Sequence, residues 1–230
     1  MRSVLSVAAL VGLASGSAAI GQDAVFSHDL QTSGPLQGFG WFSHSETRPN
    51  KNYLRADDFE LSADASIGSV EWWGQSTNDF ETSLANFDSF TVAMYESRVT
   101  GAGELRPKRA PMLSETFTLG EFASESTGRF GQDGGAEHHF TASLTTPFDL
   151  QGGVTYFFSV GAGMVDTGLD AFQWSDSIFY NGYGGSWSYT DATWLMQQDT
   201  DSAFTLFTVP TPSGFGVLSA GLLVVSRRRR

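Results

Sequence analysis

The segment Ile67-Gly68-Ser69-Val70-Glu71-Trp72-Trp73-Gly74 decides the fold class, because its large side chains alternate with a period of two residues. In an extended chain Val70 and Trp72 fall on one face, and Glu71 and Trp73 fall on the other. The same alternation recurs over residues 87–95. Alternation combined with β-branched and aromatic residues is typical of strands.

The rest of the chain up to residue 209 follows the same pattern. We expect further strands at residues 56–61, 115–119, 138–144, 154–160, 172–175, 187–189 and 202–209. No amphipathic helix of useful length is predicted between residues 53 and 209, and we expect loops at 22–52, 101–111 and 121–137. The sequence therefore predicts an all-β fold, an antiparallel two-sheet β-sandwich or jelly roll.

The charge distribution limits the classes of partner. Residues 22–209 contain all 25 acidic residues and 8 of the 13 basic ones, which gives this part of the chain a formal net charge of −17. Nucleic acid is excluded as a partner on this ground, since its binding rests on cationic contacts to phosphate. The chain has no cysteine, so we expect neither disulfides nor thiol chemistry.

Both ends of the chain have the composition of targeting segments. Residues 1–21 combine Arg2, a short apolar run and several small residues, which predicts a secretory signal peptide. Residues 210–230 consist of Pro210-Thr211-Pro212, an apolar run at 213–226 and Arg227, Arg228, Arg229 and Arg230. Because a full span needs about 20 apolar residues, we expect a short hydrophobic helix that anchors the chain in a membrane transiently. The alternative is a strand or core helix that ends in a solvated basic tag.

The three parts of this tail, in this order, resemble the PEP-CTERM sorting signal of exported bacterial proteins. In this sequence Thr211 stands where that family has a glutamate. The resemblance implies that an exosortase, a membrane-embedded cysteine transpeptidase, recognises the tail. It also implies a final location in the cell envelope, at the cell surface or in the extracellular matrix.

Residues 22–209, the expected ectodomain, carry a second resemblance. The segments Ala56-Asp57-Asp58-Phe59, Val70-Glu71-Trp72-Trp73-Gly74, Phe90-Thr91-Val92, Gly153-Val154-Thr155-Tyr156-Phe157, Gly185-Ser186-Trp187 and Ala203-Phe204-Thr205-Leu206 resemble a β-sandwich common among PEP-CTERM proteins. The resemblance implies a fold and a cell-surface setting. It implies no catalytic residue, because that family has no assigned activity.

Aromatic residues concentrate between residues 174 and 194, with glycines among them. Exposed rings on such loops can stack on the apolar faces of sugars. The candidate ligand-binding residues are Trp73, which the alternation directs outward, and Trp174, Tyr180, Tyr183, Trp187 and Trp194. The alternative is that these rings cover one end of the core.

Pairs of aspartates form a second candidate site. Carboxylates in turns are ligands that Ca²⁺ prefers, although the EF-hand pattern is absent. The candidate calcium ligands are Asp57, Asp58, Asp166, Asp170, Asp199 and Asp201. The alternative is solvated surface charge. His138 and His139 are adjacent, so on a strand they point to opposite faces and cannot chelate one metal together.

Neither GxSxG nor HExxH occurs in the chain. We therefore predict no catalytic residue and no cofactor apart from a structural Ca²⁺. The predicted function is that of an exported, non-enzymatic surface or matrix protein, sorted through its tail. The alternative is a carbohydrate-binding module that retains the protein on exopolysaccharide through its aromatic, glycine-rich region.

Overall fold

The computed structural model describes residues 22–32, 40–43, 53–77, 87–131, 134–164, 171–178, 183–188, 193–198 and 201–209. These residues form fourteen strands and no helix, arranged as two seven-stranded antiparallel sheets. The prediction of an all-β, two-sheet fold is confirmed. In this described part of the chain, no helix has the length and apolar character needed to cross a bilayer. The expected signal peptide and sorting tail lie outside the described residues.

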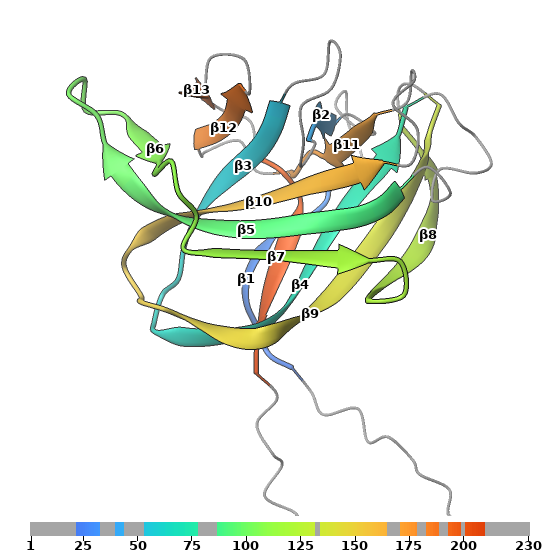
Figure 1. Cartoon of the computed structure of the whole chain (residues 1–230), viewed down its shortest axis with the longest axis horizontal. Helices are drawn as coiled ribbons and strands as arrows, with labels where there is room; N and C mark the ends of the chain where they lie inside the picture. Colours follow the sequence, from blue (N-terminus) through green and yellow to red (C-terminus); the bar gives the residue numbers. More distant parts are fainter. Residues whose placement is uncertain are drawn as a thin grey trace, which may run out of the picture. The chain divides into compact units, whose positions relative to one another are not determined.

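The two sheets form two layers whose strands cross in Figure 1. The first sheet consists of β1 (Ala24–His28), β2 (Gly40–Phe42), β4 (Ala65–Ser76), β8 (Phe122–Phe130), β9 (Ala136–Leu150), β11 (Phe172–Ser175) and β14 (Phe204–Thr208). The second sheet consists of β3 (Tyr53–Glu60), β5 (Phe87–Val99), β6 (Leu105–Pro107), β7 (Leu113–Thr118), β10 (Thr155–Met164), β12 (Tyr183–Ser188) and β13 (Thr193–Gln198).

Strand β4 is central to the first sheet. One of its edges pairs with β9 along most of its length, and the other pairs first with β14 and then with β11. The observed side-chain directions match the alternation in the sequence, because Val70 and Trp72 are fully buried while Glu71 and Trp73 are partly exposed. His138 and His139 likewise lie on opposite faces of β9, with His139 opposite Trp73.

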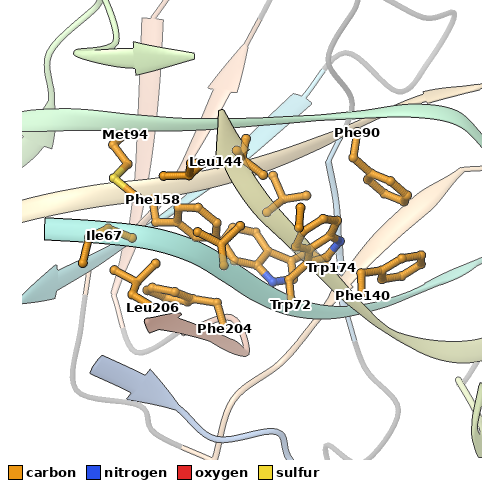
Figure 2. Packing of buried hydrophobic residues seen from close by; sticks show 14 of the residues in the cluster. Ile67, Trp72, Phe90, Met94, Phe140, Leu144, Phe158, Trp174, Phe204 and Leu206 are labelled. Atoms are coloured by element: carbon orange, nitrogen blue, oxygen red, sulfur yellow. The ribbon is translucent and has the colours of Figure 1, made fainter. Parts of the chain in front are cut away.

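The main core fills the space between the two sheets with aromatic rings (Figure 2). Trp72 stacks on Phe140 with a ring-centroid distance of 5.4 Å and an interplanar angle of 11°. Phe90, from the second sheet, contacts Phe140 at 4.7 Å and Trp72 at 5.3 Å. Edge-on and offset contacts of this kind add to the free energy of burial, so these rings hold the two layers together.

Several strands occur where loops are expected. Strands β1 and β2 lie in residues 22–52, β6 lies in 101–111, and β8 lies in 121–137. The loop prediction is therefore wrong for β8 and for the shorter strands β1, β2 and β6, whereas residues 101–104 and 108–111 are loop as expected. Strand β8 shows why, because among the described strands it pairs only with β9, and none of its residues is fully buried. The neighbouring sheet provides the hydrogen bonds that order such a strand, so its own composition signals it weakly.

The second sheet curls on itself at one end. Strand β6 contacts both β12 and β13, which belong to the opposite edge of the sheet (Figure 1). Arg106 Nη1 on β6 donates a hydrogen bond of 3.3 Å to the carbonyl oxygen of Trp194 on β13. A second apolar cluster, separate from the main core, fills the inside of this curl and contains Ala56, Ala93, Tyr95, Phe157 and Trp194.

Replacing Phe90 with alanine tests the assignment of the core. Phe90 is fully buried among aromatic rings, so we expect Phe90→Ala to lower the free energy of unfolding by about 3–5 kcal/mol. Leu119→Ala is the control, because Leu119 is 60% exposed and its loss is expected to cost less than about 0.5 kcal/mol. Urea unfolding measures both values, and equal effects would contradict the assignment.

Candidate functional site

A cavity of about 280 Å³ lies on the face of the second sheet that points away from the main core. Its volume is near the lower limit of roughly 300 Å³ usual for ligand pockets. The lining residues come from six strands and from the connection between β6 and β7. They are Leu54, Thr91, Ala93, Tyr95, Arg109, Ser114, Ser159, Trp187 and Trp194.

The strand register places a row of small residues across the floor of this face. Gly185 on β12 lies opposite Ala56 on β3, and Ala56 lies opposite Ser159 on β10. Ser159 lies opposite Ala93 on β5, which in turn lies opposite Ser114 on β7. Because side chains directly opposite each other on one face are neighbours, this row leaves a shallow trough bordered by larger rings.

The rings that border the trough differ in exposure. Trp194 is 1% exposed and packs edge-on between Tyr95 and Trp187, at 5.4 Å from each ring. Trp187 is only partly buried, so among the three rings it offers the most surface to a ligand.

Polar groups are present beside these rings. The indole Nε1–H of Trp194 is buried and has no hydrogen-bond partner among the described residues. A buried donor without a partner costs free energy that a ligand acceptor can restore. Burial raises the pKa of Tyr95, with a partial offset from the Ser159 hydroxyl, so the phenol stays protonated at neutral pH.

The structure corrects one predicted ligand-binding residue and separates the others. Trp174 is fully buried in the main core, where its Nε1 donates a 2.8 Å hydrogen bond to the Ala203 carbonyl, so it cannot stack on a ligand. Trp73 is partly exposed, but it lies on the first sheet and stacks on His139 at 4.6 Å. Tyr183 belongs to β12, and Tyr180 lies outside the described residues.

A second depression, of about 230 Å³, lies on the other face of the β12–β13 hairpin. It is lined by Trp41, Phe42, Tyr53, Ser186 and Leu195. None of these lining residues is charged, which distinguishes this depression from the cavity that contains Arg109.

Three of the six predicted calcium ligands come together. Asp57, Asp58 and Asp201 each place a carboxylate oxygen within 4.8 Å of the other two. Asp57 and Asp201 are fully buried, which the sequence did not predict. Asp57 Oδ2 accepts a 2.7 Å hydrogen bond from the Ser202 backbone N–H and lies 3.2 Å from His28 Nδ1. Asp166, Asp170 and Asp199 lie outside the described residues.

The protein provides its own positive charge at this acidic cluster. Arg55 lies two residues before Asp57 on the same inward face of β3 and is fully buried, with its guanidinium 5.1 Å from the centre of the Trp41 ring. Burial lowers the pKa of Arg55, while Asp57, Asp176 and Asp201 oppose that shift. Burial also lowers the pKa of His28, but the neighbouring aspartates, chiefly Asp57 with smaller effects of Asp201 and Asp58, together outweigh it, so the pKa is raised. Arg55 and His28 thus compete with a bound cation, and calcium at this cluster stays a prediction.

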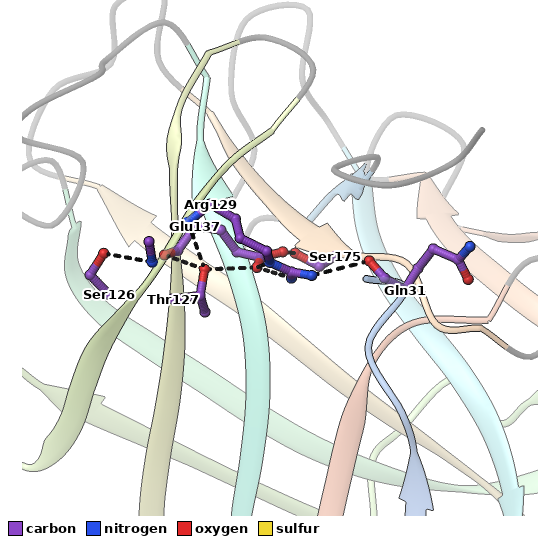
Figure 3. Close-up of polar contacts among 7 residues, drawn as sticks. Gln31, Ser126, Thr127, Arg129, Glu137 and Ser175 are labelled. Carbon is purple, nitrogen blue, oxygen red and sulfur yellow. Dashed lines mark hydrogen bonds and ion pairs between the residues drawn. The ribbon is translucent and has the colours of Figure 1, made fainter. Parts of the chain in front are cut away.

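A second ion pair has a buried carboxylate and a partly exposed guanidinium (Figure 3). Arg129 on β8 forms an ion pair with Glu137 on β9. Both carboxylate oxygens of Glu137 are occupied, because Ser175 Oγ donates to Oε1 at 2.8 Å and Thr127 Oγ1 donates to Oε2 at 3.0 Å. This network therefore joins β8, β9 and β11.

Sequence reasoning did not identify Arg55, Tyr95, Arg109 or Asp176 as site residues. The burial of Arg55 could have been inferred from the alternation, since Arg55 falls on the same face of its strand as the buried Phe59. For Arg109 the signal was the cluster of basic residues at 106–109 in an acidic domain. Tyr95 and Asp176 carry no such signal, because their environments depend on strands distant in the sequence.

Asp176 gives a prediction on pH. Burial raises its pKa to about 7, partly offset by Arg55. Between about pH 4 and pH 7 the unfolded chain therefore binds fewer protons at this residue than the native chain, so stability decreases as the pH rises. We expect Asp176→Asn to remove this decrease, which is worth up to about 4 kcal/mol. Urea unfolding of both proteins at about pH 4.5 and pH 8 measures it. The exposed Asp149→Asn is the control, and parallel profiles for all three proteins would contradict the assignment.

Comparison with known proteins places the chain in one family. No curated protein and no solved structure matches the chain. A family model described as Domain of unknown function (DUF7901) matches residues 28–210. This range includes all strands from β2 to β14, and with them every residue that lines the cavity and the whole acidic cluster. The chain therefore belongs to the DUF7901 family.

Proposed function

We propose that this protein is an exported, non-enzymatic binding protein of the cell surface or extracellular matrix, and that the cavity of its second sheet binds polysaccharide. The observation that carries the proposal is the partly exposed ring of Trp187 beside the buried, unpartnered indole N–H of Trp194. A flat ring beside a hydrogen-bond donor suits a sugar, which has apolar C–H faces and hydroxyl groups at its edge.

The floor of the cavity supports the same assignment. The small side chains of Ala56, Ala93 and Ser159 leave space above the sheet, and Trp187 borders that space. Residues on strands move less than residues on loops, so the ring and the donor are held in place before a ligand arrives. This preorganisation lowers the entropic cost of binding.

The proposed location rests on the two ends of the chain. Residues 1–21 have the composition of a signal peptide, and residues 210–230 resemble a PEP-CTERM sorting signal. We propose that an exosortase-type enzyme recognises the tail while a short hydrophobic helix holds it in the membrane. In this proposal the acidic β-sandwich-like domain lies outside the cell, in contact with the polysaccharide that it binds.

Trp187→Ala tests the binding function. Loss of the ring is expected to weaken binding to the best polysaccharide on a glycan array at least about tenfold, equal to about 1.4 kcal/mol. Trp187→Phe keeps an aromatic face and is expected to retain most of the affinity. Trp73→Ala is the matched control, because Trp73 is also partly exposed but lies on the first sheet. Titration calorimetry with the full chain measures the affinities, and equal losses in Trp187→Ala and Trp73→Ala would reject the cavity as the site.

Replacing Arg227–Arg230 with serine tests the sorting proposal. We expect export to remain intact and unsorted protein to appear in the medium, because the positive charges that retain the end of the tail on the cytoplasmic side are lost. Fractionation of cells and medium, with immunodetection of the domain, measures the distribution. Thr211→Glu restores the family's Pro-Glu-Pro and is expected to leave sorting intact. If the serine variant is retained and processed like the parent, the tail is an ordinary extension.

A further inference from the structure

The connection between β6 and β7 brings three basic residues close to the cavity, and their partners differ. Arg106 Nη2 lies 2.7 Å from Glu104 Oε2, and Lys108 forms an ion pair with Glu96. Arg109 is exposed, and no carboxylate among the described residues pairs with it. Two of the three positive charges are therefore neutralised within the protein, and the third is available to a ligand.

Arg109 is also the residue of this group that lines the cavity. Its guanidinium carbon lies 6.0 Å from the centre of the Trp187 ring, at the limit of a cation–π contact. A guanidinium presents several N–H donors in one plane and binds a carboxylate through two parallel hydrogen bonds. A ligand that stacks on Trp187 can therefore place a carboxylate within reach of Arg109.

The charges around the cavity favour such a ligand. Arg109 is the only charged residue among the described residues that line the cavity, although residues 22–209 carry a formal net charge of −17. Two other depressions among the described residues offer no positive charge. The one beside Trp41 is lined by neutral residues, and another is lined by residues that include Asp64 and Asp149. In so acidic a domain, an unpaired arginine at an aromatic cavity indicates electrostatic complementarity to an anion.

We propose that the cavity selects an acidic polysaccharide, in which the apolar face of a uronic acid ring stacks on Trp187 and its carboxylate pairs with Arg109. This inference rests on the proposed function and specifies its ligand class. Trp194, whose buried N–H has no hydrogen-bond partner among the described residues, also lines the cavity. The neutral trough formed by Ala93, Ser114 and Ser159 leaves room for the ring without placing another charge beside it.

The experiment compares polysaccharides that differ only in charge. Polygalacturonate, alginate and hyaluronate are each tested beside their carboxyl-reduced, neutral forms, with poly-glutamate as an acidic polymer that contains no sugar. Titration calorimetry with the full chain is expected to show at least tenfold tighter binding to one or more acidic forms than to the matched neutral form. The binding should weaken as the salt concentration rises, because the Arg109 contact is exposed and screened.

Substitutions then assign the charge effect to one residue. Arg109→Gln is expected to reduce affinity for the acidic form about tenfold and to leave affinity for the neutral form unchanged. Arg109→Lys keeps the charge without the planar donors, so its affinity for the acidic form should lie between those of Arg109→Gln and the parent. Lys108→Gln is the matched control, since Lys108 is the adjacent cation and is already paired with Glu96. Thermal unfolding of each variant confirms that the fold is intact.

The outcomes separate this inference from the proposed function. The selection of acidic sugars is overturned if acidic and neutral forms bind equally, or if Arg109→Gln leaves the affinity for the acidic form unchanged. In either case the proposed polysaccharide binding is still supported. Binding of poly-glutamate as tight as that of the sugars would overturn the role of the sugar ring. If no polysaccharide in the panel or on the glycan array binds, the proposed function fails as well.

Discussion

The stacking of Trp72 on Phe140, with Phe90 against both rings, is the contact on which the two-sheet structure depends. Trp72 and Phe140 belong to neighbouring strands of the first sheet, and Phe90 belongs to the second. Without cysteine the chain has no disulfide to hold its layers together, so this packing must provide the stability. It also fixes which face of β5 points inward, and thereby directs Thr91, Ala93 and Tyr95 to the cavity.

The second sheet therefore has two apolar faces with different roles. One face completes the main core, and the other carries the small apolar cluster inside the curl. The hydrogen bond from Arg106 on β6 to the Trp194 carbonyl on β13 joins the two edges of the sheet at this curl. An antiparallel sheet usually leaves its outer face to water. Here the β12–β13 hairpin bends over that face and encloses part of it, which produces a cavity with both a ring and a charge at its border.

Two groups of charged residues in the interior differ in how well their charges are compensated. The buried Glu137 pairs with the partly exposed Arg129, and its hydrogen bonds are satisfied. Burial, by contrast, raises the pKa of Asp176 to about 7, with smaller contributions from Asp57 and Asp201 and a partial offset from Arg55. A buried ionic cluster is weak evidence for stability, because the loss of hydration offsets much of the attraction. Ionisation of Asp176 as the pH rises through about 7 therefore lowers stability, and the aromatic core must exceed this cost.

The sequence by itself determined the all-β class, the two faces of β4 and the outward direction of Trp73, because strand alternation is a local property that each segment expresses alone. It also determined the acidity from which we predict that nucleic acid is not a partner. The tertiary structure decided which rings are accessible: Trp174 and Trp187 look equivalent in the sequence, but one is enclosed between the sheets and the other borders a cavity. It likewise brought Asp201 to Asp57 and Arg109 to Trp187. Such pairs depend on which strands become neighbours, and strand order follows from the packing of the whole chain rather than from any one segment.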